Sequence, residues 1–234
     1  MPASDIAITC EEVYVDYAIA TGSVRALNGV TLTLHAQRFT AIGGPSGSGK
    51  STLLRVLAGL QAPSTGSVGV GTNELSVLPR RKRRAYRRYG IGIVLQEPSD
   101  NLFAYLTAVE QLDLAAQLRG ADRPDAMALL GALGLAEMAD QLPAELSGGE
   151  QQRLAFAVAA VGRPAVILAD EPTAELDHRS AADVIAAMRT LVADGSTVVV
   201  TSHDHAVVAA ADHVVDIRDG RVVDRPHVHT DGSP

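Results

Sequence analysis

The sequence predicts an α/β fold whose core is a mainly parallel sheet covered by helices on both faces. The first observation is a set of continuous apolar runs, which are typical of strands buried on both sides; they are "FTAIGG" (39–44), "GIGIVLQ" (90–96), "PAVILAD" (164–170) and "STVVVTSHD" (196–204). The second observation is that helical patterns separate these runs, as the crossover connections of parallel strands require. We therefore expect a ligand site at the carboxyl ends of the strands.

The remaining segments add smaller parts to this core. Near the N-terminus, "EVYVDYA" (12–18) and "VTLTLHA" (30–36) alternate apolar and polar residues, which indicates half-exposed antiparallel strands. A helical pattern runs from Gly49 to Ala58, with Gly59 as a stop. The chain is mainly helical from about residue 97 to about residue 162, and "TAVE" (107–110) is a capping box inside this part. "HVVDIRDGRVV" (213–223) predicts a hairpin that turns at Asp219-Gly220.

Length and charge limit the function classes. With 234 residues, 47% of them hydrophobic, the chain can bury the core of one compact domain over residues 1–224, followed by a polar and flexible tail (225–234). His227 and His229 in that tail are candidate metal ligands, although no role is the favoured interpretation. A formal net charge of -7 and a pI near 5.4 argue against a protein that wraps nucleic acid.

Cysteine usage and hydropathy bear on location. The one cysteine, Cys10, cannot form an internal disulfide, which favours a reducing compartment and a buried, unreactive thiol. The N-terminus lacks the basic start and apolar run of a signal peptide. The longest mostly apolar stretch (154–169) is interrupted by Gly162, Arg163 and Pro164, so we expect no membrane span. Any membrane role then requires a partner.

The segment "GPSGSGKS" (44–51) matches the phosphate-binding pattern G-x-x-x-x-G-K-[ST] between an apolar strand and a helix. Glycines let the backbone curl so that several N–H groups face one anion, and the helix N-terminus adds its positive end. In this pattern Lys50 contacts the β- and γ-phosphates and the Ser51 hydroxyl ligates Mg²⁺. A glycine–serine turn that binds nothing is the poorer alternative, because strand, loop and helix are in register.

Polar residues at the ends of the other buried strands predict the catalytic groups. Asp170 is placed to hold Mg²⁺ through its water, and Glu171 to orient or deprotonate the attacking water. Gln96 is a candidate for contact with the metal or that water, and His203 for a hydrogen bond to the γ-phosphate. The alternatives are that the two acids cap a helix, that Gln96 is a surface residue and that His203 has a structural role. The catalytic interpretation is favoured because all four residues end buried strands near the same phosphate-binding loop.

A second Ser-Gly-Gly occurs in "LSGGEQQR" (146–153). Ser147 and Glu150 form a capping box, so a simple helix start is one interpretation. However, Gly148 and Gly149 in the first turn cost helix stability, about 1 kcal/mol each relative to alanine. They also leave the backbone N–H groups open to an anion. With no lysine and no metal ligand, the segment predicts half of an anion site.

Together these motifs resemble the ATP-binding cassette (ABC) ATPases, in the family's order from about residue 12 to about residue 223. "GPSGSGKST" resembles their Walker A motif, "VILADEPT" their Walker B motif and "LSGGEQQR" their signature. Gln96, "AELD" (174–177) and His203 match the Q-, D- and H-loops. The resemblance implies a P-loop NTPase core with an antiparallel N-terminal β-subdomain and an inserted helical subdomain (about 97–162).

The resemblance also implies an enzyme that hydrolyses ATP with Mg²⁺. In the family two ATPase domains pair head to tail, and the signature of each completes the ATP site of the other. One Walker A motif and one signature occur here, so a second copy must come from another chain. The implied catalytic residues are Glu171, His203 and Gln96, and the implied metal ligands are Ser51, Gln96 and Asp170. The implied nucleotide-binding residues are Tyr17, Gly44, Pro45, Ser46, Gly47, Ser48, Gly49, Lys50, Ser51, Thr52, Ser147, Gly148, Gly149, Glu150 and Asp177.

Within the family, "YGIGIVLQ", "NLFAYLTAVEQL" and "ADHVVDIRDGRVV" are similar to the subgroup that serves lipoprotein release, macrolide efflux and cell division. That subgroup works with a separate or fused permease. We therefore expect a motor subunit at the cytoplasmic face of the membrane, held by a permease that docks near Glu97–Leu106, where Leu102, Phe103 and Tyr105 are expected to be exposed. The alternatives are ATP cycling that signals through a membrane partner, or a soluble ABC protein that acts on nucleic acid.

Three features depart from the family's pattern or leave alternatives open. "QEPSDNLF" and "AELD" differ from the commoner versions, which bears on the permease and on communication between sites. For adenine stacking, Tyr17 fits the family's spacing better than Tyr14, and packing in the sheet is the alternative. The run "RRKRRAYRR" (80–88) carries seven basic residues, for which a solvated helical face is favoured over contact with anionic lipid or nucleic acid.

Overall fold

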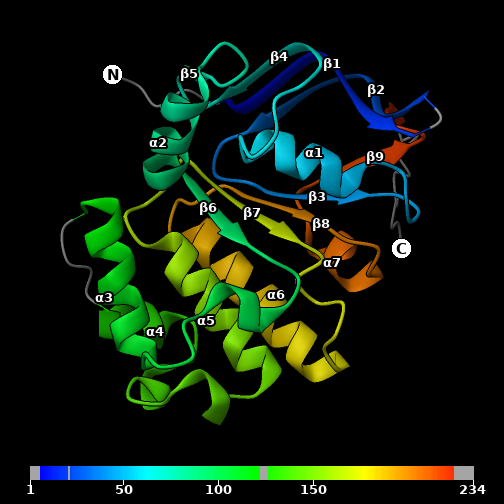
Figure 1. Ribbon diagram of the computed structural model, residues 1–234. Coiled ribbons are helices and arrows are strands. Elements are labelled where there is room, and N and C mark those ends of the chain that lie inside the picture. The colour runs from blue at the N-terminus through cyan, green and yellow to red at the C-terminus, as the bar shows by residue number, and fades with distance from the viewer. Residues whose placement is uncertain (1–5, 21, 122–125, 224–234) are drawn as a thin grey trace.

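The computed structural model describes residues 6–20, 22–121 and 126–223. A larger, mainly parallel sheet runs through the middle of the molecule (Figure 1). Helix α1 lies between this sheet and a smaller antiparallel sheet, and helices α5 and α6 lie on the opposite side. The tail (225–234), with the candidate metal ligands His227 and His229, falls outside the described residues.

The larger sheet has six strands in the order β10-β9-β3-β8-β7-β6. Neighbouring strands are parallel except β9 and β10, which form the expected hairpin, with Asp219 and Gly220 in the left-handed backbone region at φ 49° and 71°. The predicted α/β core is therefore confirmed. Its strands are β3 (Phe39–Gly43), β6 (Ile91–Val94), β7 (Val166–Asp170), β8 (Val198–Thr201), β9 (His213–Arg218) and β10 (Arg221–Val223).

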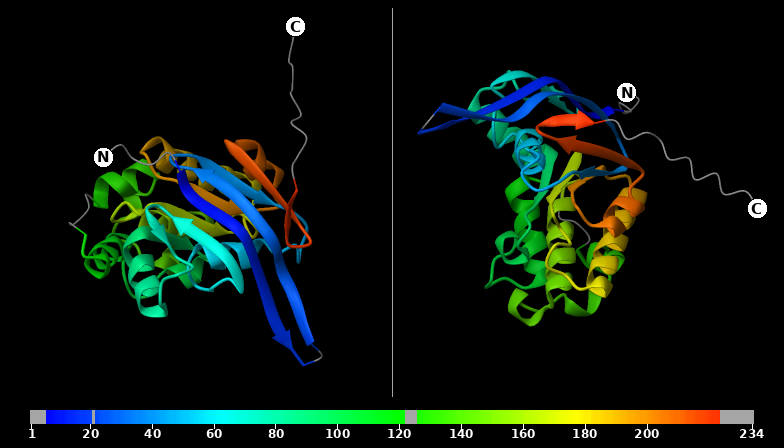
Figure 2. Two further views of the ribbon diagram at one scale, coloured as in Figure 1. Left: turned by 90° about the horizontal axis from the view of Figure 1, so that it is seen from above. Right: turned by 90° about the vertical axis from the view of Figure 1, so that its right-hand side faces the viewer.

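The smaller sheet is antiparallel, in the order β2-β1-β4-β5, as the alternating N-terminal segments predict. Its strands are β1 (Ile6–Ile19), β2 (Gly22–His35), β4 (Thr65–Val70) and β5 (Asn73–Glu74). The first two make a long hairpin that extends past the rest of the molecule (Figure 2). They exceed the segments that predicted them, because pairing continues to an exposed tip where Ile19 and Val24 meet solvent.

All described elements between β6 and β7 are helical, as expected for residues from about 97 to about 162. The boundaries of a separate helical subdomain stay a prediction. Thr107 caps the first full helix of this region with the predicted capping box. The helices are α1 (Lys50–Leu57), α2 (Arg80–Gly90), α3 (Ala108–Arg119), α4 (Ala126–Ala132), α5 (Gly148–Ala160), α6 (His178–Ala193) and α7 (His205–Ala210), with 3-10 turns η1 (Pro98–Asn101), η2 (Ala136–Met138) and η3 (Pro143–Glu145).

The central strands are mainly apolar because they are buried on both faces. In β8, Val198 and Val200 belong to the hydrophobic cluster formed with α5 and α6, whereas Val199 belongs to the cluster formed with α1 and the antiparallel sheet. In β7, Ile167 and Leu168 divide between the two clusters in the same way. Two cores on one sheet hold its strand ends rigidly, which is what a site at those ends requires.

One strand is shorter than predicted. β6 ends at Val94, so Gln96 lies two residues beyond the strand and not at its last position. The reason is local: the Asn101 side chain accepts from the Leu95 N–H at 2.7 Å and donates to the Leu95 carbonyl at 3.1 Å. These bonds use the backbone groups that would otherwise continue the strand ladder.

Two expectations about the chain's chemistry can be compared with the structure. Cys10 is buried, and burial raises the pKa of its thiol to about 12, which agrees with an unreactive packing role. Among the described ranges, no helix has both the length and the apolar character that crossing a bilayer requires.

Candidate functional site

The loop between β3 and α1 curls because Gly44, Gly47 and Gly49 take positive φ values of 140°, 75° and 107°. Two of them also allow close packing. A Cβ on Gly44 would lie 2.1 Å from the Ile217 carbonyl oxygen, and a Cβ on Gly49 would lie 2.6 Å from the Ala26 carbonyl oxygen. The loop is thus held against β9 and β2, whereas Gly47 faces open space.

This curl leaves backbone donors without protein partners. The Ser48 N–H donates to the Pro45 carbonyl at 3.2 Å, but the N–H groups of Ser46, Gly47 and Gly49 have no acceptor on any described residue. The buried Ser48 hydroxyl also has no partner within the described chain. Unpaired donors beside a helix N-terminus form a cradle for an anion such as phosphate.

Lys50 spans the mouth of this loop. Its Nζ donates to the carbonyl oxygens of Gly44 at 2.9 Å and Pro45 at 3.1 Å. It also lies 3.8 Å from Glu171 Oε1. The side chain is almost buried, so the loop itself fixes the direction of the ammonium group.

The Thr201 hydroxyl orients both acids at the end of β7. It donates to Asp170 Oδ1 at 2.5 Å and accepts from the Glu171 N–H at 3.1 Å. Thr201 pairs with Asp170 in the register of β7 and β8, which brings this hydroxyl to the acids. Thr201 was not predicted as a site residue. The feature of the sequence that could have indicated it is a hydroxyl residue at the end of the apolar run "VVVT".

Asp170 and Ser51 suit a magnesium ion. The Ser51 hydroxyl donates to Asp170 Oδ1 at 3.1 Å, so two oxygen donors are already adjacent. Mg²⁺ prefers such oxygens and keeps several waters, so one carboxylate and one hydroxyl suffice. No group of three or more His, Cys, Asp or Glu residues that could hold a metal occurs within the described ranges. The ion would therefore take most of its ligands from phosphate and water.

Glu171 lies between two basic groups. Its Oε2 is 3.0 Å from His203 Nδ1, while its Oε1 faces the Lys50 ammonium. The backbone of Glu171 is in the left-handed region (φ 45°), where a residue with a Cβ is strained by roughly 1 kcal/mol or more. Hydrogen bonds from its N–H to the Thr201 carbonyl (3.0 Å) and hydroxyl hold this conformation. The carboxylate is thereby aimed at the space in front of the loop.

Gln96 is exposed, and within the described residues no hydrogen bond joins its side chain to Asp170 or Ser51. The segment after it instead reaches the "AELD" turn. A hydrogen bond between the side chains of Glu97 and Glu175 raises the pKa of Glu97, and the negative charge of Glu175 adds to the shift. The predicted Q-loop and D-loop are therefore in contact within one chain.

Two further side chains hold this loop, and the sequence analysis missed both. Asn101 closes its start through Leu95, and Gln111, which is buried, closes its end. Gln111 accepts from the Phe103 N–H at 3.1 Å and donates to the carbonyls of Phe103 (2.7 Å) and Leu106 (3.2 Å). Their signal in the sequence is an amide residue beside an apolar run, which is too common to be diagnostic.

Tyr17 and Tyr14 face different surroundings. The Tyr17 hydroxyl donates to Gln61 at 2.7 Å and lies 3.5 Å from the Thr52 hydroxyl, beside the start of α1. Tyr14 instead donates to Glu12, and the Arg25 guanidinium stacks over its ring at 5.3 Å. Of the two, Tyr17 is therefore the one positioned beside the phosphate loop.

The second Ser-Gly-Gly begins α5 with a complete capping box. Ser147 accepts from the Glu150 N–H at 3.4 Å, and Glu150 accepts from the Ser147 N–H at 2.7 Å. The hydrogen bonds from the Ser147 side chain and then its backbone lower the pKa of Glu150. Ser147 and Gly148 are exposed, and within the described residues their neighbours are Glu150 and Leu176 and not the phosphate loop.

The two glycines of this segment differ in their surroundings. A Cβ on Gly149 would lie 2.9 Å from the Ser180 Cβ of α6, whereas a Cβ on Gly148 would reach only Leu176, at 3.4 Å. Gly149 is thus required for packing of α5 on α6. The sequence analysis attributed both glycines to ligand approach, but packing is sufficient for Gly149, and only Gly148 presents its backbone to solvent.

Asp177 caps α6 in its own chain. Its carboxylate accepts from the N–H groups of Arg179 (2.9 Å) and Ser180 (3.1 Å) and from the Ser180 hydroxyl (2.8 Å). These bonds, those from Ser180 first, lower the pKa of Asp177. The cap positions the "AELD" turn directly beside the start of α5.

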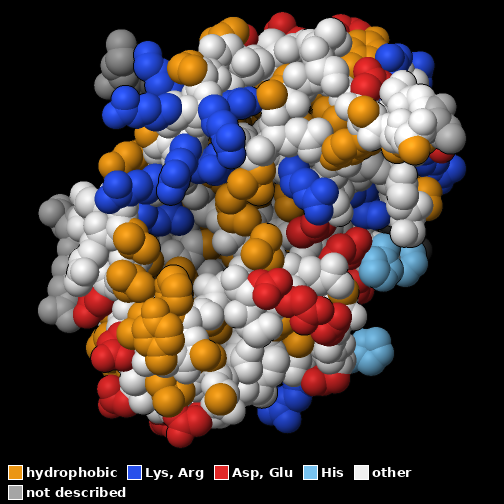
Figure 3. All heavy atoms as spheres, in the orientation of Figure 1, with side chains coloured by type: hydrophobic (Ala, Val, Ile, Leu, Met, Phe, Trp, Pro, Cys, Tyr) orange, Lys and Arg blue, Asp and Glu red, His pale blue; other side chains and the backbone are white. Residues whose placement is uncertain are grey.

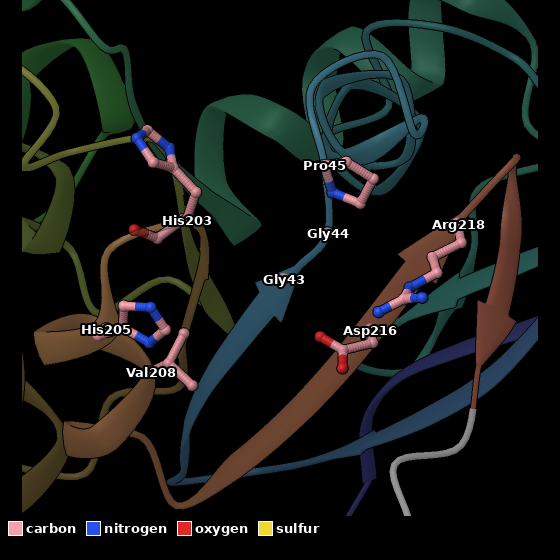
Figure 4. Close-up of a pocket in the computed structure, with 9 residues that line it drawn as sticks. Gly43, Gly44, Pro45, His203, His205, Val208, Asp216 and Arg218 are labelled. Carbon is pink, nitrogen blue, oxygen red and sulfur yellow. The ribbon is translucent and has the colours of Figure 1, made fainter.

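A pocket of ≈ 220 Å³ opens beside the phosphate loop (Figure 4). His203, His205 and Val208 line one side and Asp216 and Arg218 the other, with Gly43, Gly44 and Pro45 between them. Lys50, Ser51 and Glu171 are not among the residues that line this pocket.

Comparison with known proteins agrees with this geometry. A family model described as "ABC transporter" matches residues 27–174. The macrolide export ATP-binding/permease protein MacB of Burkholderia thailandensis is 42% identical over 215 residues, which cover 90% of this chain and 33% of that protein. MacB 2 of Yersinia pestis is 37% identical over 234 residues, covering 98% of this chain and 34% of that protein. The chain thus spans about a third of the length of these curated relatives.

Solved structures are similar over nearly the whole chain. The dimeric, post-hydrolysis form of the ATP-binding cassette MJ0796, bound to ADP and Pi, has a TM-score of 0.81 and 32% identity, covering 93% of this chain and 97% of that chain. CbiO1 of Clostridium perfringens, part of the ABC transporter complex cbiONQ, has a TM-score of 0.82 and 28% identity, covering 94% and 88% of the two chains.

The glycine geometry yields a paired prediction about stability. Gly149→Ala should lower the free energy of unfolding by about 1–2 kcal/mol, because overpacking against Ser180 outweighs the gain in helix propensity. Gly148→Ala, the matched control, should be neutral or stabilising by up to about 1 kcal/mol. Urea unfolding monitored by circular dichroism measures both. Equal effects of the two changes would contradict the packing role of Gly149.

Proposed function

The chain belongs to the ABC transporter family, and we propose that it binds and hydrolyses Mg²⁺–ATP as the motor subunit of a membrane transport complex. One observation carries this proposal: the Thr201 hydroxyl binds both Asp170, which contacts Ser51, and the N–H of Glu171, whose carboxylate lies near Lys50, beside the N–H donors of the phosphate loop. This arrangement provides phosphate binding, metal ligands and a base together.

Each residue of the phosphate site has a defined task. The free N–H groups of Ser46, Gly47 and Gly49 hold the β-phosphate, and Lys50 turns its third donor to the β- and γ-phosphates. Ser51 and Asp170 would hold Mg²⁺, and Gln96 would supply a further contact to the metal or to the attacking water. Bound there, Mg²⁺ supplies charge neutralisation for the phosphoryl oxygens.

Glu171 acts as the general base. Its carboxylate accepts a proton from the water that attacks the γ-phosphate, while the left-handed backbone and the Thr201 bonds fix its direction. His203 holds Glu171 Oε2 and is placed to donate to the γ-phosphate with its other ring nitrogen. Tyr17, beside Thr52 at the start of α1, provides the stacking surface for adenine.

The signature serves a second copy of the chain. Ser147, Gly148 and the N-terminus of α5 present donors to solvent, away from the chain's own phosphate loop. Head-to-tail pairing would place them against the partner's γ-phosphate and form two composite ATP sites, with Asp177 and Glu150 holding the segment in shape. The dimeric form of MJ0796 with ADP and Pi supports this arrangement.

The membrane partner docks on the loop from Glu97 to Leu106. Phe103 and Tyr105 are 46% and 73% exposed, and their ring centroids lie 5.9 Å apart, so they form a small aromatic surface. Leu102 was expected to be exposed but is half-buried, because it packs against the core cluster of the helical region. Gln111 fixes the backbone of the loop, so the surface is preformed.

The relatives are named for macrolide export and combine ATP-binding and permease parts. We infer that a permease of this class is the partner, and that it holds the chain at the cytoplasmic face of the membrane. The expectation of no nucleic-acid partner follows from the acidic net charge of -7.

Lys50→Ala should weaken ATP affinity roughly tenfold to a hundredfold, because a charge-assisted hydrogen bond to phosphate is lost. The chain's other lysine, Lys82, lies outside the site, and Lys82→Ala serves as the matched control. Isothermal titration with ATP at fixed magnesium gives both affinities. An unchanged affinity for Lys50→Ala would end the phosphate-loop assignment.

Glu171→Gln should retain ATP binding and lower turnover at least about a hundredfold, since the near-isosteric amide cannot accept the proton. With ATP trapped, the variant should sediment as a dimer. Adding Ser147→Arg should abolish that dimer, because a bulky cation then occupies the partner's site.

Ser147→Thr keeps the hydroxyl and the helix cap, so the Glu171→Gln, Ser147→Thr double variant should still form the dimer. A dimer that survives Ser147→Arg would refute the role of the signature in the partner's site. Loss of the dimer in both double variants would show that any change of side chain at position 147 disrupts the dimer, so that the bulky cation is not the specific cause.

Phe103→Asp combined with Tyr105→Ser should leave basal ATP hydrolysis of the isolated chain near wild type and abolish co-purification with the permease. The control pair is Ile19→Asp with Val24→Ser, two exposed apolar residues at the far hairpin tip. A complex that persists with full permease-stimulated hydrolysis would place docking elsewhere.

A further inference from the structure

Helix α2 concentrates positive charge on an otherwise acidic chain. Seven of its first nine residues are basic, six arginines and one lysine, out of 20 basic residues in all. The net charge of -7 includes these seven cations, so the rest of the chain is strongly acidic. None of the helix residues is fully buried. Such a density exceeds what solubility of one surface helix needs.

One side of α2 is anchored to the protein. The Tyr86 hydroxyl donates to the Val70 carbonyl at 2.7 Å, and Arg87 Nη1 donates to the Gly59 carbonyl at 2.8 Å. Arg88 Nε donates to the Leu118 carbonyl on α3. The helix is therefore held in one orientation. Of the five cations before Ala85, four are exposed to solvent and Arg83 is half-buried. The exposed ones are Arg80, Arg81, Lys82 and Arg84.

The cations of α2 have no carboxylate partner in the part of the chain that the structure describes. Within the described residues, no ion pair joins any of the seven to an acidic side chain. Arginines four residues apart, such as Arg80 and Arg84, repel each other, and cations in the first turn oppose the helix dipole. Burial and then the charges of Arg84, Arg83 and Arg80 lower the pKa of Arg87. Local electrostatics therefore disfavour this helix unless anions approach it.

Four exposed apolar side chains border the cations. Val77 (70% exposed) and Tyr89 flank the two ends of the helix in sequence. Leu60 follows the Gly59 carbonyl bound by Arg87, and the Leu118 carbonyl is bound by Arg88, so both lie beside the helix as well. Figure 3 shows blue side chains gathered over α2 with orange ones at their edges.

We propose that α2, together with the bordering side chains of Leu60, Val77, Tyr89 and Leu118, is a contact surface for the headgroup region of an anionic phospholipid membrane. The planar guanidinium group of arginine can donate two hydrogen bonds to the oxygens of one phosphate. Each cation near an anionic bilayer strengthens binding about fivefold. Apolar and tyrosine side chains insert at the level of the headgroups. A nucleic acid would also attract the cations, but it offers nothing for exposed aliphatic side chains such as Leu60, Val77 and Leu118.

This surface is separate from the sites described above. None of its residues lies in the phosphate site, the signature or the docking loop. α2 leads directly into the edge strand β6, whose other end leads to the loop from Glu97 to Leu106. The membrane surface and the permease contact thus lie at the two ends of one four-residue strand, roughly 13 Å long.

The test is co-sedimentation of the full 234-residue chain with vesicles. Vesicles of phosphatidylcholine with about one-third phosphatidylglycerol should bind the chain at low salt, and vesicles of phosphatidylcholine alone should not. Binding should fall steeply as ionic strength rises from about 0.05 to about 0.5 M. Equal sedimentation with the two vesicle types would overturn the proposal.

Matched variants locate the contact. Arg81→Gln with Arg84→Gln should reduce binding about 25-fold, since two cations are lost. Arg38→Gln with Arg163→Gln removes the same charge from exposed positions elsewhere and should change binding less than about twofold. Val77→Ser with Tyr89→Ser should weaken binding further, whereas Ile19→Ser with Val24→Ser should not. Equal losses in a pair and its control would refute the assignment of the surface.

Two further readouts separate the alternatives. If the chain binds single-stranded RNA through Arg81 and Arg84 but not anionic vesicles, α2 is a nucleic-acid surface and the proposal fails. ATP turnover of every variant should equal that of the wild type, which shows that the site is folded. A chain that binds vesicles through α2 but never hydrolyses ATP would support this inference while overturning the proposed function.

Discussion

The site depends on one hydroxyl at the end of a buried strand. Thr201 donates to Asp170 and accepts from the Glu171 N–H, and so gives two adjacent acids different directions. Asp170 faces Ser51, and Glu171 faces Lys50 and His203. The parallel register of β3, β8 and β7 makes this possible, because it brings the three strand ends to one edge of the sheet. Hydrophobic cores on both faces keep that register from slipping.

Local pattern was sufficient to predict most of the fold. The runs that became β3, β7 and β8 are apolar at all but one position each, and that property follows directly from burial on both faces. The capping boxes at Thr107 and Ser147 and the turn at Asp219-Gly220 were likewise predictable, because each depends on residues at most three apart in the sequence. The phosphate loop was predictable for the same reason, because its glycines and its lysine lie within one short segment of the sequence.

What could not be predicted depends on contacts between distant segments. Asn101 ends β6 early by taking the backbone groups of Leu95, and Leu102 packs into the core instead of facing solvent. Gly149 is needed because Ser180 of another helix lies against it. None of these facts is visible in the neighbouring sequence. The motifs therefore indicated which residues matter, while the tertiary contacts decided which of them have structural tasks as well.

The same contacts connect the candidate sites within one chain. The turn after Glu171 is closed by the Ala174 N–H, which donates to the Glu171 carbonyl at 3.2 Å. Glu175 in that turn shares a hydrogen bond with Glu97 at the start of the docking loop, and Leu176 lies against Gly148. Contacts over a few residues therefore join the turn after Glu171 both to the predicted docking loop and to the start of α5. The raised pKa of Glu97 follows from its hydrogen bond with Glu175, and a hydrogen bond between two carboxyl groups requires a proton. The contact with the predicted docking loop is therefore a hydrogen bond between titratable groups, whereas the contact with Gly148 rests on packing of Leu176.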